Sequence, residues 1–231
     1  MGAPRSMQVV ERHVEVSAGA VTLEGDLRLP EGACGIVLFA HGSGSSRHSP
    51  RNRFVAAMLN EGGLATLLVD LLTPKEEAVD RQTAELRFDI PFLAERLAHA
   101  ADWLTQHPET SRLRIGYFGS STGAAAALVA AALNPHIVGA VVSRGGRPDL
   151  AGPALPRVQA PTLLIVGGND TVVLGLNRRA LEQLRCEKRL VVVPGATHLF
   201  EEPGTLEEVA RLARECFKRH LAAGGTQPVP P

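Results

Sequence analysis

The sequence lacks the features that mark nucleic-acid-binding and membrane-spanning proteins. Its 24 Lys and Arg residues balance 24 Asp and Glu residues, so no net field attracts DNA, RNA or an anionic membrane. No apolar run reaches the roughly 20 residues of a membrane span, and the N-terminus lacks the apolar core of a signal peptide. We therefore expect no nucleic-acid or membrane partner and a cytoplasmic location.

Disulfide and metal-binding patterns are also missing. The three cysteines, Cys34, Cys186 and Cys216, lie far apart and show no CxxC or Cys/His spacing. They are predicted to be reduced, buried thiols. We expect no metal, no cofactor and a small-molecule substrate, and the sequence leaves a homodimer open.

The length and composition suit a single domain. At 231 residues and 45% hydrophobic content the chain can bury one sizeable core. Residues 223–231 are small, flexible or proline-rich, and such a segment cannot pack against a core. We predict one domain over residues 1–222 and a disordered tail over residues 223–231.

Short apolar runs alternate with longer segments of helical period from residue 35 onward. Such runs suit parallel strands that are buried on both faces. Strands are predicted at 35–40, 64–70, 114–119, 137–143, 161–167 and 189–195, and helices near 51–61, 89–106, 122–133, 175–185 and 205–222. Residues 8–29 predict two edge strands joined by a turn, and residues 71–88 form a long connection without a clear element. The pattern predicts a doubly wound α/β sheet, whose functional crevice lies beyond the carboxyl ends of the strands.

A GxSxG pattern follows the strand predicted at 114–119. Gly119-Ser120-Ser121-Thr122-Gly123 leads directly into an alanine-rich helix, which is the strand–turn–helix setting of a nucleophile elbow. The sharp turn requires small flanking residues and lifts the central hydroxyl to a helix start, where unpaired N–H groups gather. The pattern predicts Ser121 as a nucleophile, with an ordinary Gly/Ser-rich turn as the alternative.

An acid and a histidine follow later strands at positions that suit this nucleophile. Asp170 comes just after the strand 161–167, and His198 follows the strand 189–195. The chain order Ser, Asp, His is that of α/β-hydrolases, in which the carboxylate orients an imidazole that takes the serine proton. We predict Asp170 as the acid and His198 as the base. Alternatively, Asp170 caps the following helix and His198 is a surface loop residue.

The loop after the strand 35–40 offers backbone N–H groups beside the nucleophile. We predict that the amides of Ser43 and Thr122 form the oxyanion hole, and that His41 holds the loop by hydrogen bonding. Arg47 and His48 follow this loop and are candidate substrate contacts. Arg144 lies just past the strand 137–143, where a guanidinium can clamp a substrate carboxylate; a structural salt bridge is the alternative.

Together these motifs resemble the dienelactone-hydrolase-like branch of the α/β-hydrolases. The resemblance rests on HGSGSS at 41–46, GSSTG at 119–123, GGNDTVV at 167–173 and PGATH at 194–198, and it spans nearly the whole chain. It implies an eight-stranded, mostly parallel sheet with an antiparallel second strand and a minimal cap or none. True dienelactone hydrolases carry a cysteine nucleophile, whereas the matching residue here is Ser121.

A second resemblance concerns a longer class of protein. The segment FAHGSGSSRHSPRNR at 39–53, with LLVDLLT and FDIPFLAERL after it, resembles small hydrolase domains that are joined to phosphoribosyltransferases. Because 231 residues leave no room for that second domain, we expect a transferase label not to apply to this chain.

The function these residues predict is a serine carboxylesterase that cleaves small, short-acyl esters through an acyl-enzyme intermediate. A thioester, lactone or dienelactone substrate with the same triad is one alternative. A phosphate- or nucleotide-binding module is another, suggested by the Gly/Ser loop at 42–46, although the loop lacks GK[ST] and the third glycine of the dinucleotide pattern. A non-catalytic relative that keeps the fold for interaction is the third.

Overall fold

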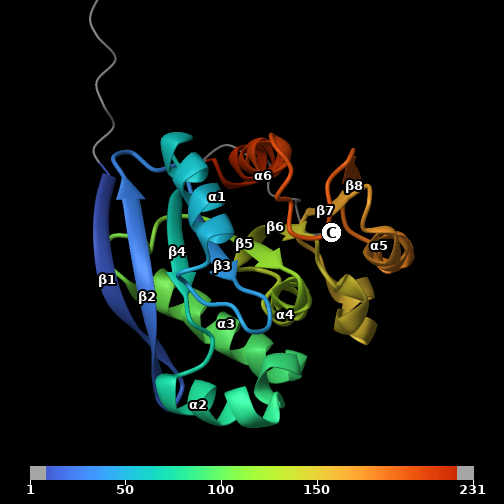
Figure 1. The fold of residues 1–231 in the computed structure, drawn as a ribbon. Coiled ribbons are helices and arrows are strands. Elements are labelled where there is room, and N and C mark those ends of the chain that lie inside the picture. The colour runs from blue at the N-terminus through green and yellow to red at the C-terminus, as the bar shows by residue number, and fades with distance from the viewer. Residues whose placement is uncertain (1–8, 223–231) are drawn as a thin grey trace, which may run out of the picture.

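Eight strands form one sheet in the order β1-β2-β4-β3-β5-β6-β7-β8 (Figure 1). A computed structural model describes residues 9–222, so the predicted tail over 223–231 lies outside the described residues. The strands are β1 Val9–Ala18, β2 Val21–Pro30, β3 Ile36–Ala40, β4 Ala65–Val69, β5 Ile115–Ser120, β6 Val138–Arg144, β7 Thr162–Gly167 and β8 Lys188–Val193. The α-helices are α1 Pro50–Glu61, α2 Pro74–Thr83, α3 Ile90–Gln106, α4 Thr122–Leu133, α5 Thr171–Gln183 and α6 Thr205–Leu221.

The direction of the second strand matches the predicted architecture. β2 runs antiparallel to both of its neighbours, β1 and β4, whereas the pairs from β4 through β8 are parallel. The mostly parallel eight-stranded sheet of an α/β-hydrolase is therefore confirmed. Parallel pairing brings the carboxyl ends of β3 and β5 to β8 to one edge, where the chain then enters the loops that carry the predicted site.

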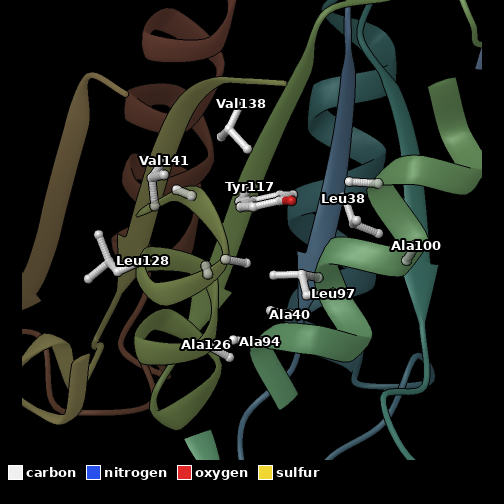
Figure 2. Close-up of a cluster of buried hydrophobic side chains, with 14 of the residues drawn as sticks. Leu38, Ala40, Ala94, Leu97, Ala100, Tyr117, Ala126, Leu128, Val138 and Val141 are labelled. Carbon is white, nitrogen blue, oxygen red and sulfur yellow. The ribbon is translucent and has the colours of Figure 1, made fainter. Parts of the chain in front are cut away.

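Successive side chains of the central strands enter two separate cores. Leu38 and Tyr117 pack with α3, α4 and α5 on one face of the sheet, and Phe39 and Phe118 pack with α1 and α6 on the other. Figure 2 shows Tyr117 and Leu38 facing the helices that carry Leu97 and Ala126. Because both faces are buried, the strands are continuously apolar, which explains why they could be recognised in the sequence.

Residues 71–88 correct one expectation, because they contain the helix α2 and a short 3-10 helix, η1, at Leu86–Phe88. A capping box starts α2: the Thr73 side chain accepts from the Glu76 N–H at 3.2 Å, and Glu76 accepts from the Thr73 N–H at 2.8 Å. The helix buries only Asp80, which pairs with Arg87 at 2.6 Å. With no apolar stripe, it gives no helical period to find.

Smaller differences concern the later elements and the cysteines. A proline-containing 3-10 helix, η2 at Pro148–Arg157, was not expected, and α5 begins at Thr171 rather than near residue 175. The three cysteines form no disulfide and are partly rather than fully buried. Within residues 9–222, no helix combines the length and apolar character needed to cross a bilayer.

Candidate active site

Ser121 occupies the sharp turn between β5 and α4. Its φ of 50° and ψ of −122° lie outside the regions that L-residues ordinarily adopt, so the turn stores backbone strain. Backbone hydrogen bonds hold it there: the Ser121 N–H donates to the Arg144 carbonyl at 3.3 Å, and the Ser121 carbonyl accepts from the Arg147 N–H at 2.9 Å. The surrounding loops therefore impose the geometry of the turn.

The two flanking glycines are required by close backbone contacts. A Cβ on Gly119 would lie 2.4 Å from the Ala124 Cα, and a Cβ on Gly123 would lie 2.2 Å from the Ala40 carbonyl oxygen. Both distances are below the 3.0 Å that real Cβ atoms observe. The first turn of α4 thus packs directly against the end of β3, as the GxSxG pattern predicts.

Asp170 and His198 come together across the loops after β7 and β8. The His198 Nδ1 and the Asp170 Oδ2 lie 2.7 Å apart. An ionised carboxylate only accepts hydrogen bonds, so Nδ1 carries the proton and Nε2 keeps a lone pair. Asp170 stands at the N-cap of α5 but makes no side-chain hydrogen bond to that helix, so the capping alternative is wrong.

The end of β6 contacts both Ser121 and His198. The carbonyl of Arg144 accepts the Ser121 N–H, and the next residue, Gly145, approaches His198 so closely that a Cβ would lie 3.6 Å from Nδ1. Arg144 and Gly145 thus link the backbone of Ser121 to the loop that carries His198. Within residues 9–222 no hydrogen bond joins the two side chains; such bonds are often long in free enzymes and tighten when substrate binds.

His41 holds the loop after β3, as expected. Its Nε2 accepts the Leu71 N–H at 3.1 Å, so its Nδ1 carries the proton and donates to the Gly42 carbonyl at 3.0 Å. Burial lowers the pKa of His41, which keeps the ring neutral. The loop then passes Ser121, because a Cβ on Gly42 would lie 3.1 Å from the Ser121 Cβ.

The two predicted oxyanion donors lie side by side. Thr122 is the first residue of α4, where a backbone N–H has no intrahelical partner. The Ser43 N–H instead donates to the Thr122 Oγ1 at 2.8 Å. In the free protein the Ser43 N–H, which was predicted to donate to the oxyanion, thus donates to the hydroxyl of Thr122 instead.

The three basic candidates have different surroundings. Arg47 forms ion pairs with Asp70 and with Glu24, the latter at 2.7 Å, and so ties its loop to β2 and to the residue that follows β4. His48 is exposed, and its backbone N–H donates to the Ser46 Oγ at 3.2 Å.

Arg144 is the exception, because two nitrogens of its buried side chain lack a hydrogen-bond partner. Arg144 is 7% exposed, and its Nε and Nη1 have no hydrogen-bond partner. It forms no ion pair among residues 9–222, so the salt-bridge alternative is wrong. Burial, together with the charge of Arg51, lowers the pKa of Arg144 to about 10.

Sequence reasoning missed three residues that shape this edge of the sheet. Gly145 touches His198, the charge of Arg51 helps to lower the pKa of Arg144, and Glu202 accepts the Thr197 N–H at 3.1 Å in the loop that carries the histidine. The paired glycines of Arg144-Gly145-Gly146 were a signal for a close approach. Nothing local in the sequence identified the other two.

The fold and the motifs at this edge define an α/β-hydrolase. Residues 24–222 match the model of the dienelactone hydrolase family, and the chain belongs to that family. It is 63% identical to the crystal structure of a dienelactone hydrolase from Anabaena variabilis ATCC 29413, with a TM-score of 0.91 over 93% of this chain and 99% of that one.

One further relative differs in length, and a second solved structure shares only the fold. A protein of Mycobacterium tuberculosis (strain ATCC 25618 / H37Rv), provisionally named a phosphoribosyl transferase, is 60% identical over 93% of this chain. The chain spans only 48% of that protein's length. Est1E from Butyrivibrio proteoclasticus shares the fold, with 17% identity and a TM-score of 0.73 over 88% of this chain and 96% of its own.

Proposed function

We propose that this hydrolase is a serine carboxylesterase that cleaves small, short-acyl esters through an acyl-enzyme intermediate. The hydrogen bond between Asp170 and His198, next to a serine held in a strained elbow, is the observation that carries the proposal. The bond fixes the tautomer in which the imidazole can accept a proton, and the elbow presents the hydroxyl at a helix N-terminus. Ser121 is the nucleophile, His198 the base and Asp170 the acid.

In the first half of the reaction, His198 Nε2 takes the proton of the Ser121 hydroxyl while Oγ attacks the ester carbonyl carbon. The carbonyl π electrons move to the oxygen, and the resulting oxyanion accepts hydrogen bonds from the amides of Thr122 and Ser43. The tetrahedral intermediate collapses, the bond to the alcohol breaks, and the alcohol oxygen takes the proton from the imidazolium. Asp170 stays ionised and stabilises that imidazolium.

The second half repeats these steps with water. His198 takes a proton from the water as it attacks the acyl carbon, and the collapse of the second intermediate returns the proton to Ser121 and releases the acid. For the oxyanion to reach the Ser43 amide, the hydroxyl of Thr122 must turn away from it, because it occupies that donor in the free protein.

Hydrolysis of a lactone, including a dienelactone, is the second candidate function. The name of the Anabaena variabilis relative, at 63% identity, favours it. The same residues would open the ring, and the alkoxide formed would remain attached to the acyl group and take the proton from His198. Rates on p-nitrophenyl esters of increasing chain length, compared with those on dienelactone and simple lactones, separate the two functions.

A fluorophosphonate probe tests the nucleophile directly, because it phosphonylates an activated serine. We expect the native protein to be labelled and Ser121→Ala to remain unlabelled. The matched control is Ser120→Ala, which removes the adjacent hydroxyl and its 3.0 Å hydrogen bond to the Asn52 Oδ1; it should still be labelled. Equal labelling of the native protein and Ser121→Ala would remove Ser121 from its role, and a native protein inert toward every activated ester would refute the esterase proposal.

A further inference from the structure

The three residues Gly145-Gly146-Arg147 link the loops of the candidate triad, and we call them the 145–147 segment. The Arg147 N–H donates to the Ser121 carbonyl at 2.9 Å. A Cβ on Gly145 would lie 3.1 Å from the His198 carbonyl oxygen and 3.6 Å from the Nδ1 of the same residue. The position of the 145–147 segment therefore affects where Ser121 and His198 lie relative to each other.

The sequence of this segment gives it little stiffness of its own, because two of its residues are glycines. Glycine has more backbone freedom than any other residue, and Gly145 adopts a φ of 51°. A stiffer residue does not fit at Gly146, since a Cβ there would lie 2.0 Å from the Ser143 Oγ and 2.5 Å from the Ala124 Cβ. The restraint on the segment must therefore come from groups outside it.

Asn177 on α5 provides such a restraint. Its side-chain Nδ2 donates to the Gly146 carbonyl at 2.9 Å and to the Val173 carbonyl, one turn earlier in the same helix, also at 2.9 Å. Carbonyl oxygens only accept hydrogen bonds, so the amide nitrogen must face them and both of its hydrogens are used. The side chain is fully buried, and these two bonds fix its orientation.

A polar side chain at this position is an exception to the pattern of α5. The buried residues of this helix are Val173, Leu174, Asn177 and Ala180, and the other three are apolar. Leucine has a similar shape and would avoid the cost of removing an amide from water, so burial alone does not explain the asparagine. Its bond to the Gly146 carbonyl ties the 145–147 segment to the helix, and leucine cannot make that bond.

The helix that carries Asn177 has Asp170 at its N-cap. The bond to Gly146 therefore connects the helix of Asp170 to the segment that contacts Ser121 and His198. We propose that Asn177 is a positioning residue, which holds the 145–147 segment and thereby keeps Ser121 and His198 aligned for proton transfer. This inference rests on the proposed esterase function, because it adds a residue that supports the same triad.

Asn60 on α1 offers a matched control, because it is also a buried asparagine that donates twice. Its Nδ2 donates to the Leu64 carbonyl at 3.0 Å and to the Thr66 Oγ1 at 3.1 Å. These bonds lie where β4 begins, at the amino edge of the sheet, away from the candidate site. Asn60→Leu therefore removes the same kind of side chain and the same number of donated bonds as Asn177→Leu, without altering the 145–147 segment.

Steady-state kinetics on p-nitrophenyl butyrate, measured well below the Tm of each variant, test the proposal. In Asn177→Leu, kcat should fall about tenfold to a hundredfold, because a displacement of about 1 Å at the reacting groups can lower a rate about a hundredfold. KM should stay close to the native value, since both halves of the reaction use the same alignment. Asn60→Leu should lower Tm by a similar amount and leave kcat close to native. Equal kcat values in the two variants would refute the proposal.

Asn177→Ser separates the two hydrogen bonds of the amide. A serine hydroxyl at this position can still bond to the Val173 carbonyl within the helix, but it is too short to reach the Gly146 carbonyl. The value of kcat should therefore fall as in Asn177→Leu, and this smaller side chain decides the question if the leucine variant does not fold. A native kcat in Asn177→Ser would refute the role of the bond to Gly146.

Amide hydrogen exchange distinguishes a failure of this proposal from a failure of the esterase proposal. The N–H groups of Gly145 and Arg147 both donate to backbone carbonyls of other segments, and they should exchange faster in the two Asn177 variants than in the native protein and in Asn60→Leu. Unchanged exchange, or faster exchange with a native kcat, would refute the positioning role. Faster exchange in a protein that hydrolyses no ester would refute the esterase proposal and support Asn177 as the residue that holds the segment.

Discussion

The strained backbone at Ser121 predicts that a substitution by glycine, which usually lowers stability, should here give a more stable protein than a substitution by alanine. Residues held in sparsely populated backbone regions cost on the order of 1–3 kcal/mol, and glycine tolerates positive φ without that cost. Ser121→Gly should therefore relax the turn, whose φ is 50°, while Ser121→Ala keeps the Cβ and the strain. Both variants lose the hydroxyl and should lose esterase activity, so the difference between them reports the backbone strain at residue 121.

The expected difference follows from two opposing terms. Strain relief favours glycine by about 2 kcal/mol, and the greater freedom of glycine in the unfolded chain disfavours it by about 0.5–1 kcal/mol. The remainder is about 1 kcal/mol in favour of Ser121→Gly. For a domain of 231 residues this raises Tm by about 2–4 °C over Ser121→Ala.

Urea denaturation and thermal melting of the two variants provide the measurement, with p-nitrophenyl acetate hydrolysis as the activity readout. The adjacent control pair Ser120→Gly and Ser120→Ala sits in β5, where glycine should be the less stable of the two. If Ser121→Gly proves less stable than Ser121→Ala by 1 kcal/mol or more, the turn is not strained and this reasoning is wrong.

Three further predictions concern the residues around Ser121. Asp170→Asn should lower kcat by about 10³–10⁴-fold in the p-nitrophenyl ester assay, because an amide favours the wrong tautomer of His198; Tm should stay close to native, since Asp170 caps no helix. Thr122→Val should lower the free energy of unfolding by about 1 kcal/mol through loss of the bond from the Ser43 N–H. Its kcat/KM should stay within about tenfold of the native value, because the oxyanion donors are backbone groups; a larger loss would give the hydroxyl a catalytic role. Burial lowers the pKa of His41 from 6.5, so the unfolded chain protonates first. The stability that neutral His41 contributes is present above about pH 6.5 and is lost as the pH falls. Melting curves between about pH 7 and 5 should therefore drop more steeply for the native protein than for His41→Gln, and parallel curves would contradict the assignment.

Much of the fold was readable because of how the strands are buried. The runs that became β3 to β8 each contain a continuous stretch that is largely apolar, so their positions were predicted to within about two residues. The helix α2 was not predicted because helices were identified by their apolar periodicity. The capping box of Thr73 and Glu76 is nevertheless visible in the sequence. The helix η2 escaped because its three prolines favour a loop in any local interpretation.

Residues of the candidate site could be predicted from the sequence only where their position along the chain was informative by itself. Ser121, Asp170 and His198 each stand just after a predicted strand, and parallel strands deliver such positions to a common edge. The state of the arginines depends instead on distant residues. Arg47 meets Glu24 on β2 and Asp70 just after β4 because those strands pair, whereas Arg144 forms no ion pair with an acid within residues 9–222. Neither outcome can be derived from the residues next to them in the chain.

Because α4 packs closely against β3, the residues of the elbow are under a steric constraint that the residues able to change substrate selectivity do not share. At Gly119 and Gly123 no larger side chain fits, so a descendant that keeps the reaction must keep both glycines. Exposed apolar residues in the segments that connect the strands and α-helices, such as Phe88, Leu150 and Leu199, have no comparable constraint. Substitutions that change substrate preference are therefore expected in those segments. A library designed to change the substrate should randomise them and keep the residues of the elbow unchanged.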